Sequence, residues 1–220
     1  MFLGHVGIGL GIKSLSPRIS LGTLLAASLF IDLLRPVIAL MRLYLARLSG
    51  NYLEISSPEV ADFSYTHSLL GVLFWASLFA VTFYIIRRTP REALICGIVV
   101  ISNWVLDLVT LHSDLTLAPG LAIQAGINLF AYLPAVLATE LSIFIIGIGF
   151  YCYRTKASDQ TGIKWFWGMM ILLLAVSLIT LFGPDPGSPL ASAWLGQALW
   201  LLVFWGYWIE RHRKLRWLYN

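Results

Sequence analysis

The segment that decides the fold covers residues 101–120 and reads Ile101-Ser102-Asn103-Trp104-Val105-Leu106-Asp107-Leu108-Val109-Thr110-Leu111-His112-Ser113-Asp114-Leu115-Thr116-Leu117-Ala118-Pro119-Gly120. It begins as the end of a long apolar run and then places polar side chains where a buried helix normally has none. Asn103 and Asp107 are four residues apart, so they share one face of a helix. His112 follows, and the Pro-Gly pair ends the element. A carboxylate in apolar surroundings is costly without a partner, so Asp107 requires polar partners from elsewhere in the chain.

The composition is that of a membrane protein. Of the 220 residues 59% are hydrophobic and only 12% are charged, and the mean hydropathy is +0.81. A soluble domain carries about 25% charged residues. We therefore expect one all-α transmembrane domain over residues 1–220, a polytopic helical bundle in the lipid bilayer. The net charge of +4 does not indicate a nucleic-acid partner, because the basic residues lie in short clusters between apolar runs. Cys96 and Cys152 lie in apolar segments and are expected to be free thiols.

Apolar runs predict six membrane spans, which cover residues 19–43, 65–86, 92–111, 133–153, 165–182 and 190–209. Residues 2–14 are too short for a span and are rich in glycine. Gly7 and Gly11 form a small-xxx-small pair, which favours close helix packing. We expect a half-helix or re-entrant segment here, carrying His5. Pro36 predicts a kink in the first span, and residues 121–130 are expected to form a short helix at the membrane.

Basic clusters predict the orientation. Arg87-Arg88-Arg91, the group Arg154, Lys156 and Lys164, and the C-terminal cluster all fall on one side of the predicted spans. The positive-inside rule makes that side cytoplasmic. The loops near residues 49–64, 112–131 and 183–189 are then external, although Arg42 and Arg47 count against this orientation.

This topology brings ionisable side chains to a similar depth on four spans. Asp32 lies in the outer half of the first span, His67 at the outer start of the second, Asp107 at the outer end of the third and Glu140 in the outer half of the fourth. Carboxylate and imidazole groups are ligands for zinc, manganese or iron. Gathered carboxylates also repel one another in a low-dielectric medium unless a cation compensates them.

Each of the acidic residues also has a purely structural interpretation. Asp32 can pair with Arg35 one turn along its helix, and Glu140 can contact water or Thr139.

The same holds for the amide and imidazole side chains. Asn103 can bridge two helices by hydrogen bonds rather than bind a metal, and His67 can be an interfacial residue at a helix start. His112 can be a solvated loop residue, and His5 is a weak candidate when taken alone.

Several sequence blocks resemble a known family. They are Gly4-His5, Ile31-Asp32-Leu33-Leu34 with Pro36, Tyr65-Thr66-His67-Ser68-Leu69-Leu70, Ser102-Asn103-Trp104-Val105-Leu106-Asp107, Asp114-Leu115 with Pro119-Gly120, Leu133-Pro134-Ala135 ahead of Glu140, and Leu181-Phe182-Gly183-Pro184. Together they resemble the bacterial inner-membrane proteins known as membrane-bound metal-dependent hydrolases, which are related to the LexA-regulated YdjM-type proteins. Relatives of this length are sometimes labelled permeases.

The resemblance implies a multi-pass protein of the bacterial inner membrane that hydrolyses an ester or phosphoester, for which a lipid or another small molecule is the candidate substrate. Asp32, His67, Asp107 and His5 would bind a divalent metal, zinc or manganese. Glu140 and His112 would act as acid or base. The chain departs from the family pattern at two positions, because Asn103 and Leu111 stand where the family has histidines.

Two other functions fit the same residues. A permease would line a transport path with these polar groups, but the sequence lacks an internal repeat and a clearly broken helix pair, which argues against a transporter. A non-catalytic membrane protein would use them only to hold its helices together.

Overall fold

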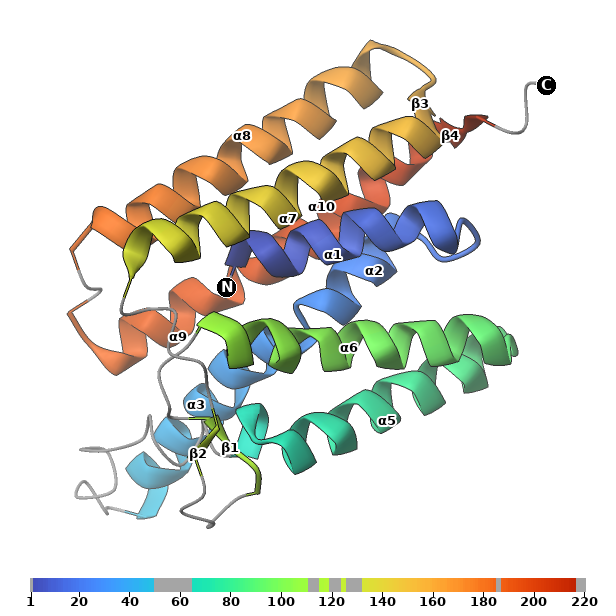
Figure 1. Cartoon of the computed structure of the whole chain (residues 1–220). Helices are drawn as coiled ribbons and strands as arrows, with labels where there is room; N and C mark the ends of the chain where they lie inside the picture. Colours follow the sequence, from blue (N-terminus) through green and yellow to red (C-terminus); the bar gives the residue numbers. More distant parts are fainter. Residues whose placement is uncertain are drawn as a thin grey trace.

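The computed structural model describes residues 2–49, 65–110, 115–118, 124–125, 132–184 and 187–216. In chain order its elements are α1 (Phe2–Leu15), α2 (Leu21–Ser28), α3 (Phe30–Ser49), α5 (Leu69–Arg87), α6 (Pro90–Thr110), β1 (Leu115–Thr116), β2 (Gln124–Ala125), α7 (Leu133–Arg154), β3 (Thr155–Ala157), α8 (Gln160–Phe182), α9 (Pro189–Gln197), α10 (Leu199–Arg211) and β4 (Arg213–Leu215). Two short antiparallel pairs, β1 with β2 and β3 with β4, are the sheet structure of the described residues. The predicted all-α class is confirmed (Figure 1).

The helices are those of a multi-pass membrane protein. Five of the described helices are long and apolar enough to cross a membrane, with α9 and α10 counted together, and the bent pair of α2 and α3 would make a sixth. Large apolar side chains face outward on each long helix, including Phe74 on α5, Ile145 on α7, Ile179 on α8 and Phe204 on α10. So much exposed apolar surface indicates contact with lipid. The six predicted spans correspond to these helices within a few residues.

Helix α1 is the expected half-helix, and it lies inside the bundle. Its 14 residues rise about 21 Å, less than the roughly 30 Å of a bilayer core. Figure 1 shows α1 between α7 and α6, and it packs on both. A methyl group added at Gly147 of α7 would lie 2.1 Å from the carbonyl oxygen of Gly7. The two backbones therefore touch at these glycines. A methyl group added at Gly11, the other member of the predicted pair, would lie an ordinary 3.8 Å from the Cα atom of Gly147.

The first span is broken, and in this respect the sequence-based expectation is wrong. The axes of α2 and α3 differ by 62° across Leu29. α3 runs through Pro36, where the kink was predicted. The cause is tertiary packing. Leu25, Leu29 and Leu33 join the core around α1, α7 and α10, whereas Ile31 joins the core of α5 and α6, so the bend lets one segment fill both.

The predicted short helix at residues 121–130 is wrong at its described positions. Gln124 and Ala125 form a strand that pairs with Leu115 and Thr116, and the other residues of that segment lie outside the described part of the chain. Leu115 is fully buried against α5 and α6, so the segment after α6 is held by core packing.

The basic clusters meet at one end of the bundle, as predicted. We call this the basic end, and it comprises the turns after α1 and α5 together with β3 and β4. The Lys13 ammonium of α1 is buried and lies 2.5 Å from the Glu210 carboxylate of α10. The Arg18 guanidinium lies 3.8 Å from the Glu92 carboxylate of α6. In Figure 1 these turns lie on the right-hand side. Cys96 and Cys152 are free thiols, as expected.

Candidate functional site

Helix α6 supplies two buried polar side chains one turn apart, Asn103 and Asp107. The Asn103 amide nitrogen donates to the Asp32 carboxylate at 2.9 Å and to the carbonyl oxygen of Ser28 at 3.4 Å. Asn103 thus connects α6 to both sides of the break between α2 and α3. The interpretation of Asn103 as a helix-bridging residue is confirmed. Its side-chain oxygen is buried and has no hydrogen-bond partner among the described residues.

Asp32 is placed by the break in the first span. It lies in the first turn of α3, directly after the bend at Leu29. The N-terminus of a helix carries a partial positive charge, which favours a carboxylate there. The bend therefore turns a helix start and its acidic residue toward α1, α5 and α6. A straight span would have placed Asp32 in a helix interior without this support.

His5 is the central residue of the group. Its ring lies on α1 and is 1% exposed. Its Nε2 atom is 3.4 Å from an Asp107 carboxylate oxygen and 3.8 Å from an Asp32 oxygen. Neither ring nitrogen makes a well-directed hydrogen bond with a residue that the structure describes, although Nε2 faces the Asp107 carboxylate. Buried polar atoms in native proteins are normally satisfied, so an imidazole of this kind indicates a ligand, an ion or a water at the site.

His67 reaches the group from the segment before α5. It precedes Ser68, whose side chain caps α5 by accepting from the Gly71 amide. The His67 Nε2 atom lies 3.9 Å from the other Asp32 oxygen, and its Nδ1 atom lies 2.7 Å from the Thr66 hydroxyl. This second contact fixes the ring orientation. If the Thr66 hydroxyl accepts a hydrogen bond from Nδ1–H of the neutral ring, then Nε2 carries the lone pair that a ligand beside Asp32 could use.

The structure therefore brings together four of the predicted residues, which we call the polar cluster: His5, Asp32, His67 and Asp107. The predicted approach of Asp32, His67 and Asp107 is confirmed, since His5 contacts both carboxylates and His67 contacts one. Sequence reasoning did not include the Ser28 carbonyl or the Thr66 hydroxyl. Thr66 could have been suspected from its place beside His67, whereas nothing in the sequence indicated that the Ser28 carbonyl would be at a helix break.

Glu140 lies beside the polar cluster. It is on α7 and is 9% exposed. Its carboxylate accepts from the backbone N–H of Phe2 at the start of α1, and it lies near His5 and Asp107. The location suits a group that exchanges protons with the cluster. His112, the second predicted acid or base, lies outside the described residues.

The donor set of the polar cluster suits a divalent metal, but its geometry is wider than a metal site. Ligand atoms about 2.0–2.1 Å from zinc in a tetrahedron lie about 3.4 Å from one another. The measured separations are 3.4, 3.8 and 3.9 Å. Within the described ranges, no three histidine, cysteine, aspartate or glutamate side chains are placed to hold one ion. Small side-chain rotations would be needed to bring the donors onto a common centre. The unsatisfied nitrogens of His5 are the observation that favours such a ligand.

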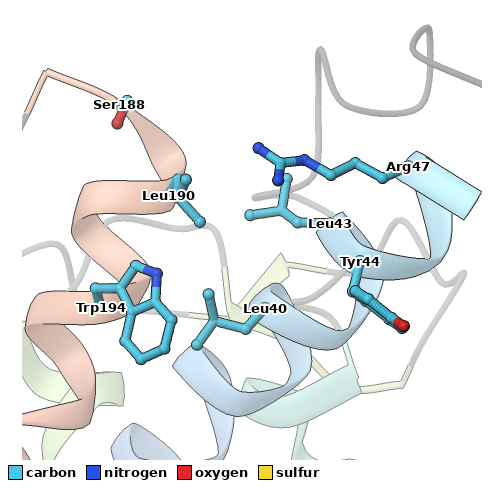
Figure 2. Close-up of a pocket in the computed structure, with 7 residues that line it drawn as sticks. All are labelled: Leu40, Leu43, Tyr44, Arg47, Ser188, Leu190 and Trp194. Carbon is cyan, nitrogen blue, oxygen red and sulfur yellow. The ribbon is translucent and has the colours of Figure 1, made fainter.

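A cavity of about 440 Å³ lies elsewhere, between α3 and α9. Figure 2 shows Leu190 and Trp194 of α9 facing Leu40 and Leu43 of α3, with Arg47 at one side. None of the polar cluster residues lines this cavity. Its walls are largely apolar, so we do not place the chemistry of the polar cluster in this cavity.

Fold and cluster together define the class: a multi-pass α-helical membrane protein with a largely buried group of carboxylates and imidazoles at the break of one span, of which Asp32 is partly exposed. Neither a protein-family model nor a curated protein or solved structure matches the chain.

Proposed function

We propose that this protein is a metal-dependent hydrolase of the bacterial cytoplasmic membrane that acts on an ester or phosphoester, as the family that it resembles is named. The observation that carries the proposal is His5, a buried imidazole without a hydrogen-bond partner among the described residues, within 4 Å of two carboxylates from different helices. An unsatisfied imidazole between two carboxylates is the arrangement that a divalent cation would complete.

In this proposal His5, Asp32, His67 and Asp107 bind zinc or manganese. A divalent ion would supply an acidified water and would polarise the ester or phosphoryl oxygen. Thr66 orients the His67 ring, and the Asn103 amide holds the Asp32 carboxylate in place. Such partners fix the direction of ligands and strengthen metal binding.

Glu140 is the proposed proton-exchange group. It is nearly buried on α7, and the backbone N–H of Phe2 holds its carboxylate at the start of α1. A carboxylate beside but outside the ligand set can take a proton from an attacking water and return it to the leaving group.

The test is metal analysis of the detergent-purified protein. We expect about one zinc or manganese ion per chain, and Asp107→Asn and His5→Gln should each abolish it. Asp159→Asn is the matched control, because that carboxylate is exposed at the opposite end of α7 and α8. Metal at the same level in the wild type and in both cluster variants would exclude the proposed site.

A permease remains the second candidate because one observation favours it. The bend of 62° between α2 and α3 is a discontinuous span, with Asp32 and the Ser28 carbonyl at the break. In many transporters the substrate or coupling ion binds at such a break. Purified protein in liposomes distinguishes the two functions, since a permease releases a loaded solute without hydrolysing it. A protein that binds no metal, hydrolyses nothing and moves no solute would instead use the cluster to hold its helices together.

A further inference from the structure

A groove of about 700 Å³ runs along the outer surface between α2, α5 and α10. It is separate from the polar cluster, none of whose residues lines it. α5 packs mainly on α6, and α10 packs mainly on α2, so the short helix α2 forms the floor between two longer walls. Phe79 and Phe83 line it from α5, and Phe204 lines it from α10.

One end of this groove is polar and basic. Arg18 and Arg87 line it there, at the basic end of the bundle. Arg87 is exposed and makes no hydrogen bond or ion pair with the residues that the structure describes. Arg18 is 83% exposed, and its ion pair is a long contact of 3.8 Å to Glu92. Guanidinium groups with so few protein partners are well placed to bind an anion, and their planar geometry matches phosphate.

Hydroxyl groups lie at the same end. The hydroxyls of Ser20, Thr23 and Tyr207 form a chain with separations of 2.8 Å, and all three residues line the groove. They add hydrogen-bonding capacity next to the arginines, whereas the rest of the groove is lined mainly by aromatic and aliphatic side chains. The groove is thus amphipathic along its length.

Its length matches one leaflet of a bilayer. The lining residues of α5 run from Leu78 to Arg87, which corresponds to a rise of about 14 Å. Half of a hydrocarbon core is about 15 Å thick. An acyl chain that lies along the aromatic wall would therefore place its phosphate at the level of the arginines.

We propose that this groove binds an anionic phospholipid from the leaflet at the basic end, with the phosphate held by Arg18 and Arg87 and one acyl chain lying between α5 and α10. Charge complementarity selects this occupant over a zwitterionic lipid, because two guanidinium groups face the head group and no carboxylate lines the groove. The proposal does not depend on the chemistry of the polar cluster.

The experiment titrates the delipidated full chain in detergent with phosphatidylglycerol and with phosphatidylcholine of identical acyl chains, and counts bound lipid by native mass spectrometry. We expect tighter binding of phosphatidylglycerol. Arg18→Gln and Arg87→Gln should each weaken it about five-fold and leave phosphatidylcholine binding unchanged. Lys164→Gln is the control, because Lys164 is an exposed base at the same end that does not line the groove.

A second variant tests the apolar wall. Thr82→Trp should fill the groove and weaken both lipids, while a melting curve shows that the protein stays folded. Equal affinities for the two lipids, or equal losses in the Lys164 and arginine variants, would overturn the proposal. So would inorganic phosphate that displaces phosphatidylglycerol and binds with the same affinity, because the site would then recognise a free anion.

Discussion

Asn103 lies one turn before Asp107 on α6, and its side chain connects Asp32 of α3 to α6. We predict that Asn103→His raises the affinity for zinc or manganese by about tenfold, because it adds an imidazole one turn from Asp107. Asn103→Leu is the control, since it removes the hydrogen bond without adding a ligand. Metal titration of the purified variants measures the effect. An unchanged metal affinity in a folded Asn103→His protein would mean that the cluster has only a structural role.

At the basic end the buried Lys13 pairs with the partly exposed Glu210, and the Lys13 ammonium also donates to the carbonyl oxygens of Pro17 and Ile19 at 3.0 and 2.7 Å. We predict that Glu210→Gln destabilises the fold by about 3 kcal/mol, because it leaves a buried ammonium without its counter-charge. Unfolding in mixed micelles measures the free energy.

Glu92→Gln is the comparison for this prediction. Its carboxylate faces the exposed Arg18 side chain at 3.8 Å, so the loss should stay below about 1 kcal/mol. Equal losses in the Glu92 and Glu210 variants would contradict the argument that the buried Lys13 ammonium depends on Glu210 for its counter-charge.

Individual residues show which contacts can be predicted from the sequence and which cannot. Asp32, His67 and Asp107 could be predicted as neighbours, because a charge in an apolar run requires a partner and the topology gave all three a similar depth. The role of Lys13 could not be predicted, because its partner is 197 residues away in the sequence. From sequence, Lys13 was only a base at the end of a short helix.

At the scale of elements, the contact between α1 and α7 positions His5. We predict that Gly147→Ala destabilises the protein by about 1–3 kcal/mol, because the new methyl group would lie 2.1 Å from the Gly7 carbonyl oxygen. The variant should also bind less metal, since α1 carries His5 toward Asp107. Gly149→Ala is a closely matched control, because a methyl group there meets nothing within 4 Å. A similar stability and metal content for the two variants would refute the close packing.

The interaction that caps the N-terminus of α8 involves an ionisable side chain, so its contribution to stability depends on pH. Asp159 caps it by accepting from the Gly162 amide at 2.7 Å, and the same carboxylate lies 2.8 Å from His212. The hydrogen bond with His212 lowers the pKa of Asp159. A lowered folded-state pKa stabilises the fold above the unfolded value of about 3.9, and the stabilisation is lost as the pH falls through the folded-state pKa.

We therefore predict that Asp159→Asn melts at a lower temperature than the wild type at pH 6, and that this difference shrinks as the pH falls below about 3.9 and is lost through the lowered folded-state pKa of Asp159. Ser188→Ala removes the uncharged cap of α9, so its effect should not follow this titration. A difference for Asp159→Asn that does not shrink at any pH below about 3.9 at which the protein stays folded would show that the carboxylate charge is not involved.

The helices themselves could be predicted from apolar runs, because a membrane span must satisfy its backbone hydrogen bonds internally. The break at Leu29 could not, because neither glycine nor proline marks it and competing core contacts of Leu33 and Ile31 produce it. Pro36 was a local signal for a kink, and tertiary packing moved the bend seven residues earlier. The pairing of β1 with β2 was missed because the register of two-residue strands leaves no periodic pattern.

At the scale of the whole molecule, α1, α3, α6 and the segment before α5 meet at the polar cluster, and the basic residues gather at the other end of α5 and α6. The positive-inside rule orients the full spans and places Asp32, His67 and Asp107 at a similar depth, which was sufficient to predict that they are neighbours. The same argument gave His5 too little weight, because the depth of a half-helix in the membrane cannot be predicted until its packing partner is known. The contact of α1 with α7 supplies that depth.

The orientation in the membrane is the last prediction. Positive charge is retained on the cytoplasmic side during insertion, and the basic end carries the Arg87-Arg88-Arg91 cluster and the bases around β3 and β4. We predict that green fluorescent protein fused after Asn220 fluoresces, because it folds only in the cytoplasm, and that alkaline phosphatase inserted after Gly187 is active.

Arg42 and Arg47 at the far end of α3 provide the internal check on this prediction, because they are the bases that oppose it. Replacing both with glutamine should leave the two reporter signals unchanged or stronger. An active phosphatase after Asn220 would reverse the orientation. The polar cluster would then lie toward the cytoplasm, so a hydrolase at this site would act on a cytoplasmic ester, and the groove of Arg18 and Arg87 would take its lipid from the outer leaflet.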